Sequence, residues 1–207
     1  MFLYKLEKYN SLFVDASSIL EIGAGQGWAA ALTKRLYPNA HVTVSDISAE
    51  AISLTKYWEN LFCVQMDGKL ACKSYEIPLP DNSVDLVYAF QSAHHFTEQR
   101  QTLAEVKRIL KPGGHLLYLH EPSCLQFIYP LAYRRVNKKR PYVPEDVLVY
   151  TNVIQLAREV GFAKAELHFD PTLLNRGPIE TVYFYGLQKI SGLRRFLPCT
   201  ADYIFQK

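Results

Sequence analysis

The feature that most constrains this fold is a cluster of three glycines directly after a short apolar run. Residues 18–22 read SILEI; Gly23, Gly25 and Gly27 follow, and a helical pattern begins at Trp28. Glycines in such a loop let the backbone turn tightly and let a ligand approach without an intervening side chain. The pattern predicts a buried strand, a ligand-binding loop and a helix, which is the opening unit of a doubly wound α/β domain.

The rest of the chain continues this alternation. Apolar and β-branched runs predict further strands at 41–45, 61–66, 84–90, 115–121, 166–169 and 201–205, and helical periodicity predicts helices at 28–36, 48–60, 97–110 and 151–160. Alternating strands and helices form βαβ units around a parallel sheet. We therefore expect a doubly wound, Rossmann-like α/β fold with a seven-stranded, mostly parallel sheet and one antiparallel strand near the C-terminus.

Composition narrows the class of protein without identifying it. The 207 residues suffice for one domain, which we place at 1–207, with a core at 18–122 and lid insertions at about 122–150 and 171–199. The formal net charge of +3 is too small to indicate nucleic acid. No signal peptide or membrane-length apolar run is apparent. No pair of cysteines has C-x-x-C spacing and no His/Cys group has zinc-site spacing, so we expect reduced thiols, no metal and a cytoplasmic protein.

Two residues around the glycine loop favour one ligand over another. A dinucleotide site would have its third glycine at position 28, where this chain has Trp28. Glu21, just before the loop, would repel a pyrophosphate but would suit the ammonium and sulfonium groups of S-adenosylmethionine (SAM). Asp46 ends the second predicted strand, where it could accept hydrogen bonds from ribose hydroxyls or cap the next helix. Asp67 ends the third, where it could meet an adenine amino group or form a turn.

Four motifs carry a family resemblance: ILEIGAGQG, VSDIS, LPDNSVDLVYAFQSAHHF and LKPGGHLLYLHEP. Over about residues 18–122 the chain resembles the class I SAM-dependent methyltransferases, in particular the small-molecule group that includes the quinone-biosynthesis enzymes. The resemblance implies SAM as cofactor and methyl transfer to a small organic acceptor at oxygen, nitrogen or carbon, giving S-adenosylhomocysteine. It implies cofactor contacts at Glu21, Gly23, Ala24, Gly25, Gly27, Asp46, Ile47, Asp67, Gly68 and Gln91.

The catalytic candidates lie just beyond the fourth predicted strand and at the end of the fifth. Methyl transfer requires alignment of the reactants, and a base only when the acceptor is weakly acidic. His94 and His95 could accept a proton or could line the pocket wall. Glu121 should point toward the same crevice, and His120 should face the other way because neighbours on a strand alternate.

Two segments in the second half of the chain are each compatible with several binding partners. A basic cluster could bind an anionic acceptor or RNA, or form a solvated face. It consists of Arg134, Arg135, Lys138, Lys139 and Arg140, with Tyr129, Tyr133 and Tyr142 nearby. The aromatic segment 182–197 could be a lid, a homodimer surface or a membrane-surface patch. Pro198-Cys199 is misplaced for a cytosine methyltransferase, which argues against nucleic acid.

Three alternative functions remain at this point. The short segment before the first strand keeps open a catalytically silent SAM-binding partner subunit. The basic cluster keeps open an RNA or protein methyltransferase. A nicotinamide-dependent reductase is disfavoured by Trp28 and Glu21.

Overall fold

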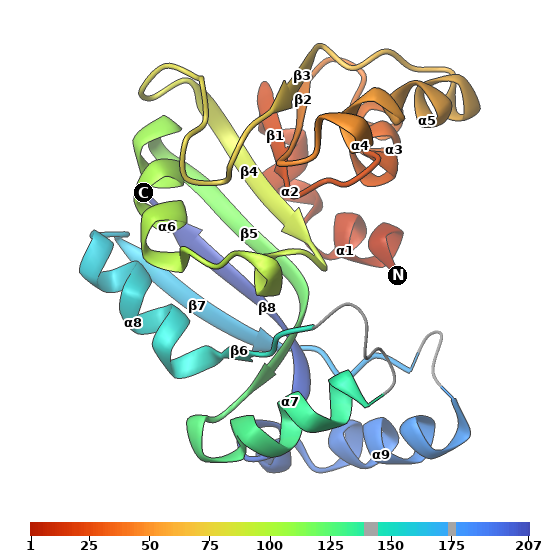
Figure 1. Cartoon of the computed structure of the whole chain (residues 1–207), viewed down its shortest axis with the longest axis vertical. Helices are drawn as coiled ribbons and strands as arrows, with labels where there is room; N and C mark the ends of the chain where they lie inside the picture. Colours follow the sequence, from red (N-terminus) through yellow and green to blue (C-terminus); the bar gives the residue numbers. More distant parts are fainter. Residues whose placement is uncertain (139–144, 174–176) are drawn as a thin grey trace.

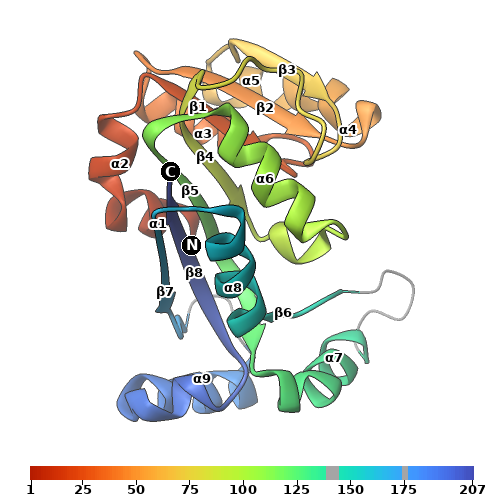
Figure 2. The ribbon, with the colours of Figure 1, turned by 90° about the vertical axis from the view of Figure 1, so that its left-hand side faces the viewer.

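The computed structural model describes residues 1–138, 145–173 and 177–207 and shows a single mixed sheet with helices on both faces (Figures 1 and 2). The strand order is β3-β2-β1-β4-β5-β8-β7, and the short β6 pairs with β5. β8 runs antiparallel to both of its neighbours and the other pairs are parallel. The expected doubly wound fold is confirmed, with β6 as an eighth strand. The strands are β1 (Ser18–Ile22), β2 (His41–Asp46), β3 (Gly68–Ala71), β4 (Val84–Phe90), β5 (Leu110–Cys124), β6 (Leu148–Val149), β7 (Lys164–Phe169) and β8 (Cys199–Gln206).

Helices cover the two faces of the sheet in separate groups. One face packs against α1 (Phe2–Lys8), α2 (Asn10–Val14), α3 (Trp28–Leu36), α4 (Ala49–Ser53) and α5 (Thr55–Phe62). The other packs against α6 (Gln99–Ile109) and α8 (Tyr150–Val160). Beyond the carboxyl end of β5 lie α7 (Tyr129–Asn137) and α9 (Pro178–Lys189), as Figure 1 shows. Short 3₁₀ turns complete the chain: η1 (Ala93–His95), η2 (Gln126–Ile128) and η3 (Ser191–Arg195).

The central strands are buried on both faces, and this makes them a rigid base for the loops at their carboxyl ends. Along β4, Leu86 and Tyr88 join the core under α3, whereas Val87 and Ala89 join the core under α6 and α8. Over residues 86–89 this alternation follows from the pleat of a strand. A near-continuous apolar run is typical of a parallel strand covered on both sides. None of the helices in the described part of the chain combines the length and apolar content of a membrane span.

The N-terminal helix α1 is fixed to the β7–β8 part of the sheet by buried ion pairs. The ammonium group of Lys5, fully buried, lies 2.6 Å from Asp202 Oδ1 and 2.6 Å from Asp170 Oδ2. Phe2 packs against the ring of Tyr88 at 5.7 Å between centroids. Removing one partner from such a network leaves an uncompensated buried charge, so α1 depends on Lys5 for its position.

The third strand differs from the prediction. Residues 61–66 were expected as a strand, but α5 continues to Phe62 and β3 begins only at Gly68. Trp58 and Phe62 stand one helical turn apart and their rings stack at 6.3 Å, so the apolar run continues the helix. Cys63, with a φ of 53°, ends it. As a result Asp67 precedes β3 instead of following a strand.

Candidate functional site

The loop between β1 and α3 has the backbone conformation that its glycines indicate. Gly23, Gly25 and Gly27 have φ values of 64°, 54° and 77°, a region that residues with a side chain rarely adopt. A Cβ on Gly23 would also lie 2.9 Å from the ring of Phe96. The Ala24 amide donates to the Ser45 carbonyl at the end of β2. The loop is thus held against the carboxyl ends of β1 and β2.

A cavity of about 210 Å³ lies beside this loop. It stands where the strand order reverses between β1 and β4, which is the usual ligand position in a doubly wound sheet. Gly23, Asp46 and Ile47, three of the predicted cofactor residues, line it. The side chain of Ile47 is 74% exposed, so this apolar surface is available to a flat ligand such as a purine. The remaining lining residues are Ser45, Cys72, Lys73, Ser74, Tyr75, Ser92, His95, Phe96 and Thr97.

Asp46 is oriented by two backbone amides. Its Oδ2 accepts from the amide of Gly25 at 2.7 Å and its Oδ1 accepts from the amide of Ser48 at 2.9 Å. A carboxylate has about four lone-pair sites, so Asp46 can still accept hydrogen bonds from the two hydroxyls of a diol. The cap of α4 is Ser48, whose hydroxyl accepts from the amide of Ala51. Asp46 therefore supports the glycine loop while it lines the cavity.

Glu21 is not among the residues that line this cavity. It lies on the α3 face of β1, 3% exposed, and accepts a hydrogen bond from the Tyr88 hydroxyl at 3.2 Å. Burial raises the pKa of Glu21 to about 8, so its neutral form is favoured at neutral pH. The pleat directs this side chain behind the loop, so the prediction that Glu21 presents a negative charge to the ligand stays a prediction, which this orientation does not favour.

Asp67 and Gly68 lie at the amino edge of the sheet and are not among the residues that line the cavity, so their adenine contacts stay a prediction that this placement does not favour. Asp67 Oδ2 lies 2.8 Å from Lys34 Nζ and accepts from the amide of Val42 at 2.8 Å. A Cβ on Gly68 would lie 2.6 Å from Thr43 Oγ1, so this glycine permits β2 and β3 to pair closely. The segment 72–75 follows β3 and lines the cavity instead. If the helical periodicity of the sequence had been extended through Phe62, the third strand would have been predicted later in the chain, and segment 72–75 would have been placed at its carboxyl end.

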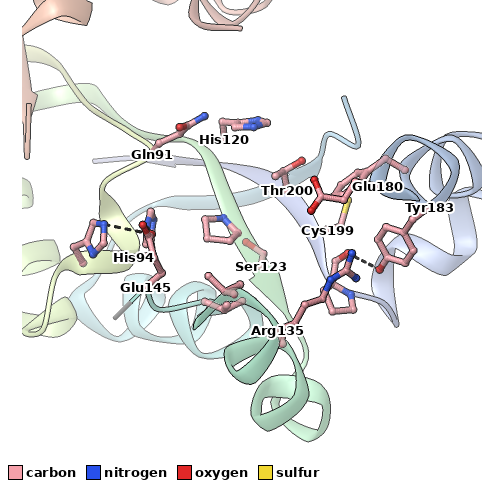
Figure 3. Close-up of a pocket in the computed structure, with 17 residues that line it drawn as sticks. Gln91, His94, His120, Ser123, Arg135, Glu145, Glu180, Tyr183, Cys199 and Thr200 are labelled. Carbon is pink, nitrogen blue, oxygen red and sulfur yellow. Dashed lines mark hydrogen bonds and ion pairs between the residues drawn. The ribbon is translucent and has the colours of Figure 1, made fainter. Parts of the chain in front are cut away.

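A second, larger cavity of about 500 Å³ opens below the carboxyl ends of β4 and β5 (Figure 3). Gln91, predicted to lie near the cofactor's methionine, lines this cavity and not the smaller one. Arg135 of α7 and Tyr183 of α9 form its far wall, with the guanidinium 5.2 Å from the centre of the tyrosine ring. This cavity therefore combines a cation, aromatic surface and polar groups.

His95 is the residue that lines both cavities. It belongs to η1, which directly follows β4, and its side chain is 45% exposed. The neighbouring Phe96 faces only the smaller cavity. His95 therefore stands at the junction where ligands in the two cavities would meet.

His94 is held between two carboxylates. Its Nδ1 lies 2.7 Å from Glu121 Oε2. Its Nε2 lies 3.0 Å from Glu145 Oε2, the contact drawn in Figure 3. Burial opposes a charge on the ring, but the hydrogen bonds and charges of Glu121 and Glu145 outweigh it and raise the pKa of His94. Each ring nitrogen therefore faces a carboxylate oxygen. The role of His94 as a general base stays a prediction, which these two contacts do not favour.

Glu121 and His120 have exchanged the faces predicted for them. The β5–β8 register shifts between Tyr118 and Glu121, and His120 has a φ of 60°, so a bulge interrupts the alternation. His120 lines the larger cavity. Glu121, fully buried, accepts from the backbone amides of Ser92, Ala93 and His94. Its role is to fix η1, and it does not face an acceptor.

The basic cluster divides in the structure. Arg135 lines the larger cavity, and Lys138 follows the end of α7. Lys139, Arg140 and Tyr142 lie outside the described residues. The segment 182–197 forms most of α9 and η3, and its side chains include Val182, which is 74% exposed. The same segment contributes Tyr183 and Phe184 to the cavity wall.

Comparisons with known proteins place similar sequences among methyltransferases. The family model described as "Methyltransferase domain" matches residues 20–118. A fatty-acid O-methyltransferase of Mycolicibacterium smegmatis is 30% identical over 122 residues, 56% of this chain and 42% of that protein. The ubiquinone/menaquinone biosynthesis C-methyltransferase UbiE of Desulfotalea psychrophila is 33% identical over 118 residues, 56% of this chain and 47% of its own length. The chain thus spans about half the length of the curated relatives it matches.

The likeness extends to solved structures. A SAM-dependent methyltransferase from Archaeoglobus fulgidus superposes with a TM-score of 0.67 at 15% identity, covering 99% of this chain and 92% of that one. At this identity the similarity shows the fold alone.

Proposed function

We propose that this chain, which matches the methyltransferase domain family over residues 20–118, is a class I SAM-dependent methyltransferase that transfers a methyl group to a small organic acceptor and releases S-adenosylhomocysteine. The observation that carries the proposal is the pair of cavities that share His95. One has the residues to hold an adenosine and the other has room for an organic molecule of modest size.

The smaller cavity fits SAM by the chemistry of its lining. Asp46 would accept hydrogen bonds from both ribose hydroxyls, and Ile47 would cover one face of the adenine. Gly23 would let the ligand approach the backbone between Ser92 and Phe96. When bound, SAM supplies a methyl carbon activated by its sulfonium. The contribution of the protein is to align an acceptor atom with that carbon, which can supply several kcal/mol of the barrier reduction.

The larger cavity favours an acceptor that carries an anionic group. The Arg135 guanidinium can pair with a carboxylate or phosphate, and Tyr183 and Phe184 offer apolar surface beside it. The names of similar proteins mention fatty acids and ubiquinone/menaquinone biosynthesis. In the reaction, the acceptor oxygen, nitrogen or carbon forms a bond to the methyl carbon, the sulfur–methyl bond breaks, and the acceptor proton passes to solvent or a base. We expect the segments 122–150 and 171–199 to act as the lid of the larger cavity.

Binding and transfer are tested in sequence. Calorimetric titration and thermal unfolding with S-adenosylhomocysteine should show one site, and ligand at a hundred times its Kd should add about 2.7 kcal/mol of stability. NADH and NADPH serve as matched controls and should add none. Label from methyl-tritiated SAM should then appear in a member of a panel of aromatic, fatty and hydroxy acids. Stabilisation by NADH in place of S-adenosylhomocysteine would overturn the proposal. Binding without transfer to any acceptor would favour the catalytically silent subunit.

A further inference from the structure

Three potential metal-ligating side chains converge on the wall of the larger cavity. His94 Nε2 lies 3.0 Å from Glu145 Oε2, and His95 Nε2 lies 3.7 Å from the same oxygen. All three ligand atoms lie within 4.8 Å of one another. From this geometry we propose that His94, His95 and Glu145 bind a first-row divalent cation such as Zn²⁺, Fe²⁺ or Mn²⁺ at the junction of the two cavities.

The separations suit a metal ion without rearrangement of the backbone. With metal–ligand bonds of about 2.1 Å, neighbouring ligand atoms stand roughly 3.0 Å apart in an octahedral site and about 3.4 Å apart in a tetrahedral one. The two separations to Glu145 Oε2, 3.0 Å and 3.7 Å, need shifts of a few tenths of an ångström. The ligand atoms of His94 and His95 lie within 4.8 Å of each other and would need to approach by up to about 1.4 Å, which side-chain rotation can supply. Two imidazoles and one carboxylate form a ligand set that first-row divalent ions accept, with coordination positions left open toward the cavity.

The ligands are also held in place from behind. His94 Nδ1 faces Glu121 Oε2 at 2.7 Å, which is the carboxylate–histidine arrangement that orients metal-bound imidazoles. The backbone of Glu145 is fixed by Asn137, whose amide donates to the Glu145 carbonyl at 2.8 Å and accepts from the Glu145 amide at 2.9 Å. The rings of His94 and His95 lie 4.1 Å apart between centroids. The site is therefore pre-organised by contacts that the ion would not disturb.

Charge favours a divalent ion at this position. The side chains of Glu121 and Glu145 are 0% and 13% exposed, so two carboxylates share one nearly buried place. A place that holds two carboxylates attracts a divalent cation, and on binding the hydrogen bond between His94 and Glu145 would give way to two metal bonds.

The ion would act on the acceptor, a role that rests on the proposed function. An acceptor oxygen at an open coordination position would be polarised and its pKa lowered. A second oxygen of the same molecule, as in a vicinal diol or a hydroxy or keto acid, could chelate the ion, while its anionic group reaches Arg135 across the cavity. As a ligand, His95 would orient the acceptor through the ion and would not accept its proton.

The test uses tag-free protein stripped with a chelator and titrated with Co²⁺ alone. Calorimetry and visible absorption of the Co²⁺ ion should show one equivalent bound per chain. His95→Ala and Glu145→Gln should each weaken Co²⁺ binding at least tenfold, the lower bound seen even when a residue that only supports a metal ligand is lost. His168→Ala is the matched control, because His168 pairs with Glu166 at 3.3 Å on β7 and should leave Co²⁺ affinity unchanged.

The outcomes separate the two proposals. Absence of stoichiometric Co²⁺ binding, or equal affinity in wild type, His95→Ala and Glu145→Gln, overturns the metal site. Far-UV circular dichroism confirms that the variants fold, which the 45% exposure of His95 favours. Binding of S-adenosylhomocysteine by the stripped wild-type protein is measured in parallel. Failure there counts against the proposed function and leaves the metal site to be decided by Co²⁺ alone.

Discussion

Replacing Glu21 by glutamine should stabilise the protein, and more so as the pH rises. The carboxyl group is 3% exposed and its single side-chain partner among the described residues is the Tyr88 hydroxyl. Its pKa is about 8 in the folded protein, against an ordinary value of 4.5. A raised acid pKa means that the folded state holds the proton more tightly than the unfolded chain. This contribution to stability is complete below about pH 4.5 and is lost as the pH rises toward 8.

The size of the stability change follows from the pH range between the two pKa values of Glu21. Each pH unit between the two pKa values costs about 1.4 kcal/mol, so the wild type should lose roughly 3 kcal/mol between about pH 5.5 and about pH 7.5 from this group alone. The glutamine side chain of the variant carries no proton to lose, and its amide oxygen can still accept from Tyr88. Urea unfolding of both proteins at the two pH values gives the stability difference, in which every other titrating group cancels.

The expected result is a difference that grows by about 3 kcal/mol in favour of Glu21→Gln over this interval. A difference that stays constant would mean that Glu21 is ionised in the folded protein. The loop would then carry a second negative charge beside Asp46, and the original interpretation of Glu21 as a partner for a cationic ligand would return. The experiment therefore decides which side chain gives the cofactor cavity its charge.

Three further predictions concern the site and its support. Asp46→Ala should weaken S-adenosylhomocysteine binding about ten- to a hundredfold, roughly 1.5–3 kcal/mol, in calorimetry; Asp67→Ala should leave it unchanged, and equal losses would contradict the assignment. Gly25→Ala should cost about 1–2 kcal/mol in urea unfolding because of its positive φ, and Gly27→Ala should cost more because its Cβ would lie 2.9 Å from a threonine methyl; equal costs would remove the steric argument. Lys5→Met should lose about 3–5 kcal/mol of stability, and a loss below about 1 kcal/mol would show that the buried network tolerates its absence.

What the sequence predicted well is what short-range chemistry determines. The glycine loop needs positive φ values at Gly23, Gly25 and Gly27, and no other residue type meets that need as easily. The end of β2 follows from an apolar run that stops at Asp46, with Ser48 as the helix cap beyond it. These features lie within a few residues of one another, so one pattern in the sequence determines both the local structure and its place at the sheet edge.

The errors arose where a local pattern had two structural solutions. The apolar run at 61–66 suits a strand as well as the end of an amphipathic helix, and packing of Phe62 against Trp58 decided for the helix. Moving the strand shifted Asp67 from the functional edge to the opposite one. At His120 a bulge reversed the alternation along β5. The residues around His120 do not predict a positive φ at this histidine.

The acceptor side of the site was beyond sequence reasoning for a different reason, which is that it is assembled entirely from long-range contacts. His94 and Glu145 are separated by 51 positions, and His120 meets the wall formed by Tyr183 only because β8 returns antiparallel beside β5. The cofactor side is built from consecutive βα units, whose geometry repeats from one such domain to the next. The two sides are therefore fixed by different parts of the chain. Changes in the segments around α7 and α9 can alter the acceptor while Asp46 and the glycine loop keep the same ligand.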